Sequence, residues 1–155
     1  MWFSRKQGIK VPPNGAENRT LALPNQGTTK SRGDAAEAAA LAYLVRNGLK
    51  LIDTNYRTPG RGGGEIDLIM RAADGTLVFV EVRQRSNASH GGAAASIGSV
   101  KQRRIIFAAR HYLMRFASLP PCRFDVVLVD GRPGNDKPER PVARIEWLRA
   151  AFDAS

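Results

Sequence analysis

Two apolar segments joined by an Asp-Gly turn constrain the fold of this chain more than any other feature. Glu65–Arg71 and Leu77–Arg85 are rich in Ile, Leu, Val and Phe, and Asp74 and Gly75 lie between them. Branched and aromatic side chains favour strands, and an Asp-Gly pair between two such segments is typical of a hairpin. The sequence therefore predicts two antiparallel neighbouring strands. A hairpin alone is marginally stable, so other elements must cover it.

The rest of the chain supplies those elements. The residue patterns predict helices over residues 34–47 and 100–116, and strands or short elements over residues 49–57, 123–130 and 142–152. The apolar run from Val126 to Val129 indicates a strand that is buried on both faces. Together these elements predict an α/β fold with a mixed central β-sheet flanked by α-helices.

The chain divides into a tail and one domain. Residues 1–32 have no sustained apolar periodicity and contain Pro12, Pro13 and Pro24, a composition typical of a flexible segment. The tail is basic, so it is either an arm that follows a phosphate backbone or a solvated leader. A chain of 155 residues fits one ordinary domain and leaves little room for a second. Residues 33–155 are therefore predicted to form a single domain.

Charge and cysteine content narrow the class of function. Lys and Arg number 24 against 14 Asp and Glu, which gives a net charge of +10. Such a surface favours a polyanion such as nucleic acid as partner, although some basic proteins have no such partner. Cys122 is the single cysteine, so neither an internal disulfide nor a zinc cluster is expected, and a metal would be held by oxygen.

No run of about 18 apolar residues is present, and the N-terminal residues are mixed and charged. We therefore expect a cytoplasmic protein without a membrane partner.

Three carboxylates are expected to meet on the hairpin. Because side chains alternate along a strand, Glu65, Asp67 and Ile69 should share one face of the first hairpin strand, and Glu81 should lie on the neighbouring strand. Opposed carboxylates are destabilising unless a cation or hydrogen bonds neutralise them. Mg²⁺, or Mn²⁺ in its place, would serve. The residues alone leave two interpretations open: a metal site, or a salt-bridge network with Arg57, Arg61, Arg83 and Arg85.

Two further side chains lie on the apolar stripes of the predicted helices. Lys101 precedes Ile105 by four residues on the apolar stripe of its predicted helix, so its ammonium either approaches the acidic cluster or extends past the core into water. Glu37 lies on the sheet-facing stripe of the first predicted helix. Its spacing from Asp34 is that of a capping box, in which Glu37 would bond backbone N–H groups at the helix start.

Arg103 and Arg104 belong to a helix segment that contains no acidic residue. A solvated basic face and a ridge that contacts nucleic-acid phosphates have the same sequence pattern.

Two short runs on the hairpin carry a resemblance: GEIDLI at residues 64–69 and VFVEVR at residues 78–83. They resemble the signature of the YraN family of bacterial proteins. Lys101, the segment RFDVV at residues 123–127 and the pair Glu146-Trp147 also fit that family. The resemblance covers residues 33–152 and omits the tail.

The resemblance implies a restriction-endonuclease-like core, shared with Holliday-junction-resolvase-like proteins, whose common pattern is an Asp followed later by Glu-x-Lys. Asp67 and Glu81 match the two acids. Arg83 stands at the Lys position, and a guanidinium stays protonated, so it is a poor proton acceptor. The implied activity is metal-dependent hydrolysis of nucleic-acid phosphodiesters, and the alternative is a non-catalytic nucleic-acid-binding protein that retains the nuclease fold.

The implied site has Asp67 and Glu81 as ligands of Mg²⁺ or Mn²⁺ and Glu65 as a third ligand. Glu37 assists, and Arg83 and Lys101 meet the phosphate. Side chains expected to contact nucleic acid are Arg57, Arg61, Arg85, Arg103 and Arg104. DNA is expected rather than RNA, and the resolvase-like relatives also suggest a homodimer.

Overall fold

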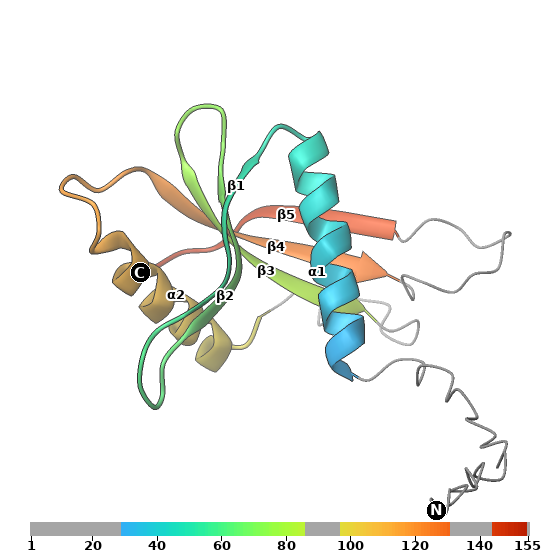
Figure 1. The fold of residues 1–155 in the computed structure, drawn as a ribbon, viewed down its shortest axis with the longest axis horizontal. Helices are drawn as coiled ribbons and strands as arrows, with labels where there is room; N and C mark the ends of the chain where they lie inside the picture. The colour runs from blue at the N-terminus through green and yellow to red at the C-terminus, as the bar shows by residue number, and fades with distance from the viewer. Residues whose placement is uncertain (1–28, 86–96, 131–143, 155) are drawn as a thin grey trace, which may run out of the picture.

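A computed structural model describes residues 29–85, 97–130 and 144–154 of the chain. These ranges contain two helices and five strands (Figure 1): α1 (Thr29–Arg46), β1 (Lys50–Arg57), β2 (Glu65–Arg71), β3 (Leu77–Arg85), α2 (Ser99–Leu113), β4 (Cys122–Asp130) and β5 (Arg144–Phe152).

The strands form one mixed sheet in the order β1-β2-β3-β4-β5. β3 and β4 are parallel, and the other neighbouring pairs are antiparallel. At the β2–β3 turn, Gly75 has a φ of 89°, and the Thr76 N–H donates to Asp74 Oδ1 at 2.9 Å. The predicted hairpin and the predicted α/β class are thus confirmed.

The two helices cover opposite faces of the sheet (Figure 1). Ala40 and Leu44 of α1 pack over Val78 and Val80 of β3. On the other face, α2 contributes an apolar stripe that packs over β3, β2 and β4, with Ile105, Ala108, Ala109 and Tyr112 buried. Each helix presents apolar residues at helical spacing to the sheet, which is why both faces of β3 and β4 are buried. Neither helix in the described ranges has the length and apolarity needed to cross a membrane.

Helix α1 begins at Thr29, five residues before the predicted start. Residues 29–32 are therefore helical, and assigning them to a flexible tail was wrong. Residues 1–28 lie outside the described residues, so a flexible tail there stays a prediction, as does the division into tail and single domain. Asp34 and Glu37 lie inside the helix, not at its start, so the capping box was also wrong, because no unpaired N–H groups remain at that point of a helix.

The regular alternation expected along β2 was wrong too. Ile66 and Ile69 belong to the same core layer, against α2, although they are three residues apart. The physical reason lies in the strand pairing: β2 pairs with β3 only from Leu68 to Arg71, and the two strands separate before Leu68. On the other side, Asn55 of β1 has a φ of 51°. This departure from the regular sheet opens the place where the carboxylates lie.

Gly64 allows α2 to approach the start of β2. A Cβ atom at this position would lie 1.9 Å from the carbonyl oxygen of Arg104 and 2.9 Å from the Cβ of Ala108. We expect Gly64→Ala to lower the free energy of unfolding by about 1–3 kcal/mol, because the helix must move. Urea denaturation measures this. The matched control is Gly33→Ala in α1, where nothing lies within 4 Å, and it should stabilise the protein by about 0.5–1 kcal/mol. Equal stability of Gly64→Ala and the unchanged protein would contradict the packing.

Candidate functional site

A buried pair of carboxylates lies where β2 and β3 separate. Asp67 is 9% exposed and Glu81 is 7% exposed, and a hydrogen bond joins their side chains. Burial raises the pKa of Asp67. Burial and the nearby charge of Asp67 raise the pKa of Glu81 to about 8. Removing two carboxylates from water favours their neutral forms, so the raised pKa keeps Glu81 protonated at neutral pH.

Lys101 approaches this pair from α2, the helix that covers one face of the sheet. Its Nζ lies 3.3 Å from Glu81 Oε1, and the ammonium lowers the pKa of Glu81 against the larger effect of burial. Of the two interpretations left open for Lys101, this contact corresponds to the approach to the acidic cluster, although the side chain remains 45% exposed. A cation therefore stands beside the carboxylate pair and within reach of solvent.

Backbone geometry holds Asp67 in place. Its Oδ2 accepts the Val82 N–H at 2.8 Å, at a level of the hairpin where β2 no longer pairs with β3. The side chain thus satisfies a donor that a neighbouring strand would otherwise satisfy. In contrast, Glu81 Oε2 is buried and has no hydrogen-bond partner among the described residues.

Two more carboxylates surround the pair at a greater distance. Glu65 forms an ion pair with Arg57, with Glu65 Oε1 3.2 Å from Arg57 Nη2. Glu37 projects from α1 toward Asn55 of β1, and the Asn55 side chain hydrogen bonds with it. Burial raises the pKa of Glu37, and the charges of Asp67 and Glu65 raise it further, so the four carboxylates share one electrostatic environment.

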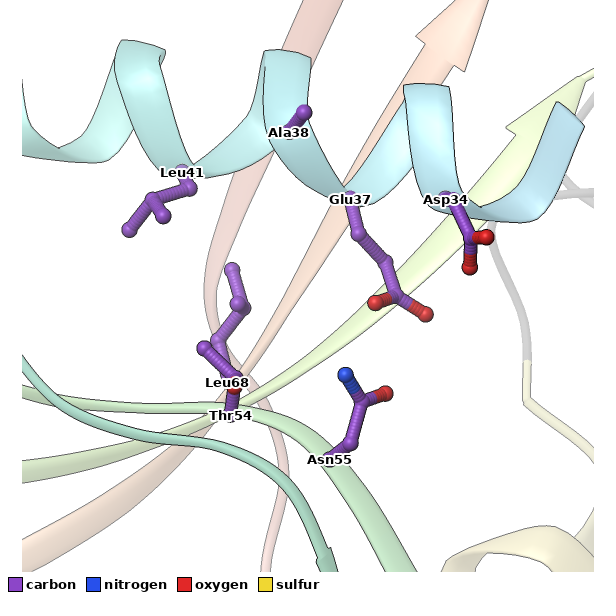
Figure 2. Close-up of a pocket in the computed structure, with 7 residues that line it drawn as sticks. All are labelled: Asp34, Glu37, Ala38, Leu41, Thr54, Asn55 and Leu68. Atoms are coloured by element: carbon purple, nitrogen blue, oxygen red, sulfur yellow. The ribbon is translucent and has the colours of Figure 1, made fainter. Parts of the chain in front are cut away.

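A pocket of about 260 Å³ lies beside Glu37, between α1 and strands β1 and β2. Figure 2 shows the Glu37 carboxylate and the Asn55 side chain pointing toward each other across it. The other lining residues are Asp34, Ala38, Leu41, Thr54 and Leu68. Glu37 is therefore next to the pair but separated from Lys101 by the sheet, since α1 and α2 cover opposite faces.

The donor set fits a divalent cation held by two carboxylates. Asp67 and Glu81 supply oxygen donors, and the buried, unpartnered Glu81 Oε2 is the kind of atom that a cation satisfies. Within the described parts of the chain, no group of three or more His, Cys, Asp and Glu side chains is arranged to hold an ion. Mg²⁺ is commonly held by one or two carboxylates together with water and phosphate, so this pair suffices. Glu65, the predicted third ligand, is engaged by Arg57 instead.

The arginine side chains that were predicted to contact phosphate differ in their ion pairing and in their exposure to solvent. Arg85 is held by Asp130, at 2.9 Å, and by Glu146, at 2.5 Å, so two carboxylates offset its charge. Arg83 is half-buried and lies in register with Leu128 of β4. Four others are exposed: Arg57, which pairs with Glu65, Arg61 in the β1–β2 loop, and Arg103 and Arg104 on α2. The roles of all these side chains stay predictions.

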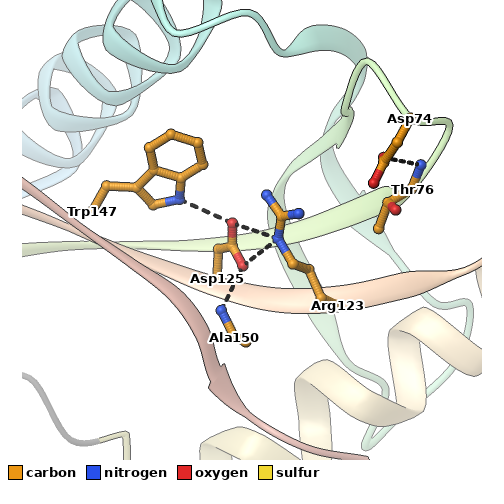
Figure 3. A network of polar contacts seen from close by, with 6 residues as sticks. All are labelled: Asp74, Thr76, Arg123, Asp125, Trp147 and Ala150. Carbon is orange, nitrogen blue, oxygen red and sulfur yellow. Dashed lines mark hydrogen bonds and ion pairs between the residues drawn. The ribbon is translucent and has the colours of Figure 1, made fainter.

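One buried carboxylate was missed by the sequence reasoning. Asp125 of β4 is fully buried and accepts the Trp147 Nε1–H at 2.9 Å, the Ala150 N–H at 2.9 Å and the Arg123 Nε–H at 3.0 Å (Figure 3). These contacts join β4 to β5 at Ala150, whose φ is 47°. The available signal was an Asp inside an apolar run, with an Arg two residues before it and a Trp on the next strand.

Fold and site together define an α/β protein with a mixed five-stranded sheet and a buried, cation-flanked carboxylate pair. A family model described as "Uncharacterised protein family UPF0102" matches residues 36–129. A "UPF0102 protein" of Polaromonas naphthalenivorans (strain CJ2) is 74% identical over 155 residues, all of both chains. One from Paracidovorax citrulli (strain AAC00-1) is 57% identical over 142 residues, 92% of each chain.

The chain therefore belongs to the UPF0102 family, which is the YraN family of the sequence resemblance.

Proposed function

We propose that this protein is a metal-dependent nuclease that hydrolyses nucleic-acid phosphodiesters, with Asp67 and Glu81 as the ligands of Mg²⁺ or Mn²⁺. The observation that carries the proposal is the buried carboxylate pair, with Lys101 3.3 Å from Glu81. Two opposed buried acids are unfavourable for folding unless a cation or a proton neutralises one of them. A fold that keeps them at a break in the sheet therefore favours a role in binding a cation.

The residues have distinct roles in this proposal. When bound, a divalent cation polarises a phosphoryl oxygen and lowers the pKa of water. The Lys101 ammonium can donate to a phosphate oxygen and stabilise the charge that develops there. Arg83, at the position of the usual Lys, can contribute positive charge but accepts no proton. Lys101 thus supplies an ammonium that the hairpin itself lacks.

The surface charge supports a polyanionic substrate. The chain carries a net charge of +10, and Arg61, Arg103 and Arg104 are exposed. We propose DNA as the substrate. A cytoplasmic location and a homodimer stay predictions.

A second candidate is a non-catalytic nucleic-acid-binding protein. Arg83 favours it, because this arginine stands at the Lys position of the nuclease pattern and cannot exchange a proton at ordinary pH. The basic surface would then bind phosphates without hydrolysis.

One experiment separates the two candidates. The full chain is incubated with Mg²⁺ or Mn²⁺ and a panel of duplex, branched, flapped and single-stranded DNA and RNA. We expect cleavage that disappears in Asp67→Asn and in Glu81→Gln. The matched control is Asp153→Asn, an exposed carboxylate after β5, and it should cleave normally.

Calorimetric titration with Mn²⁺ reads the metal site independently, and Glu81→Gln should weaken binding. Salt-sensitive binding of nucleic acid without cleavage of any substrate would support the second candidate. Cleavage that survives Asp67→Asn would refute the proposed site.

A further inference from the structure

The outer face of α2, continued by the C-cap residue Met114, exposes three large apolar side chains. Val100, Phe107 and Met114 are 57%, 54% and 80% exposed, and they are spaced seven residues apart. Seven residues make two helical turns, so the three side chains follow one line along the helix. They lie on the side away from the buried stripe of the same helix, which faces the sheet. Phe107 is the aromatic member of the line.

The surroundings of Phe107 are cationic. Arg103 and Arg110 lie four residues before it and three residues after it, so both side chains neighbour the ring on the helix surface. Helix α2 contains no acidic residue. In the described ranges no carboxylate forms an ion pair with Arg103 or Arg104, and Arg110 donates only to the carbonyl of Ala154, at 3.3 Å. An exposed ring among unneutralised guanidinium groups is suited to an anionic partner that also has an apolar face.

A continuous row of side chains connects this face to the carboxylate pair. Lys101, Arg104 and Phe107 are three residues apart, so each is the helix-surface neighbour of the next. The row winds from the ammonium beside Glu81 to the exposed ring and advances about 9 Å along the helix axis. A strand with a phosphate at Lys101 can therefore reach Phe107 within a few nucleotides.

We propose that the outer face of α2, namely Val100, Arg103, Phe107, Arg110 and Met114, binds unpaired nucleobases. Phe107 stacks on a base, while Arg103 and Arg110 contact the adjoining phosphates. This assignment rests on the proposed function only for the choice of nucleic acid as the partner.

Unpaired bases fit this face better than a duplex or a second copy of the chain. Within a duplex each base is already stacked, so a ring that protrudes from a helix meets phosphates and groove edges instead of π-faces. A second copy would bring Arg103 and Arg110 of both chains to the same interface, where like charges repel. Bases of single strands present their faces to aromatic side chains, and Arg beside the ring binds the backbone.

Binding is measured by fluorescence anisotropy with a labelled single-stranded DNA 20-mer and with its duplex, in EDTA so that no cleavage occurs. We expect Phe107→Ala to weaken single-strand binding about five- to 100-fold and duplex binding less than about twofold. Phe107→Trp should retain single-strand affinity, and Phe107→Leu should lose it, because stacking needs a π-system. The matched control is Val45→Ala, another exposed apolar side chain, and it should bind normally.

Three results would overturn the assignment: unchanged single-strand affinity in Phe107→Ala, full affinity in Phe107→Leu, or a dimer by ultracentrifugation that Phe107→Ala dissociates. The readouts keep the two proposals apart. If the unchanged protein cleaves no substrate, only the nuclease proposal is refuted. The binding measurements in EDTA test only the base-stacking proposal.

Discussion

Asp125→Ala is expected to lower the free energy of unfolding by about 3–5 kcal/mol. The carboxylate is fully buried and accepts hydrogen bonds from Trp147, Ala150 and Arg123 (Figure 3). Removing it leaves a partly buried guanidinium and two further donors without an acceptor. Each unsatisfied buried donor is destabilising by about 1–3 kcal/mol, so the loss exceeds that of an ordinary hydrogen bond. Urea denaturation followed by tryptophan fluorescence measures it.

The matched control for this prediction is Asp130→Ala on the same strand. Asp130 pairs with Arg85, but its side chain is 32% exposed, so its loss should lower the free energy of unfolding by at most about 1 kcal/mol. Equal effects of the two substitutions would show that the buried network is not what holds β5 to β4.

Stability should fall as pH rises from about 4.5 to about 8, because folding raises the pKa of Glu81 to about 8 from 4.5. Below pH 4.5 the carboxyl group is protonated in both states, and it opposes folding least there. As pH rises, the unfolded state loses the proton first, so the free energy of unfolding falls until Glu81 also ionises at about pH 8, and it stays at that lower value above this pH. The full difference is at most roughly 5 kcal/mol.

Glu81→Gln tests this prediction, since an amide does not titrate. The variant should have a flatter profile of the free energy of unfolding between pH 5 and 9, and it should be more stable than the unchanged protein at about pH 9. Mg²⁺ should stabilise the unchanged protein at that pH and leave Glu81→Gln unaffected. Asp153→Asn should follow the unchanged protein. Parallel profiles for the unchanged protein and Glu81→Gln would contradict the assigned shift.

Most strands could be predicted because their pattern is local. The segment from Leu77 to Arg85 combines branched and aromatic side chains with an Asp-Gly turn before it, and the structure has the same strand bounds. The start of α1 was harder, because Thr29, Ser31 and Gly33 are weak helix formers and propensity did not indicate a helix there.

The candidate site was predicted in part. The sequence placed Asp67 and Glu81 on neighbouring strands and directed Lys101 toward the sheet, since both follow from the spacing of apolar residues. It could not show that β2 and β3 separate before Leu68, because a loss of pairing depends on the whole sheet. The contacts of Asp125 could not be predicted in full, since two of its three donors come from another strand, 22 and 25 residues away.

The order in which the chain closes its contacts has a consequence for folding. The carboxylate pair comes from a hairpin with a short turn, whereas Lys101 comes from the crossover that must lead to β4 before the parallel pairing forms. Short loops close before long ones. The hairpin is therefore expected to form before Lys101 arrives, when only a proton or a dissolved cation can neutralise its two carboxylates. The rate of the earliest folding phase should then depend on the pH and the divalent cations of the buffer, at a stage when the binding site is not yet complete.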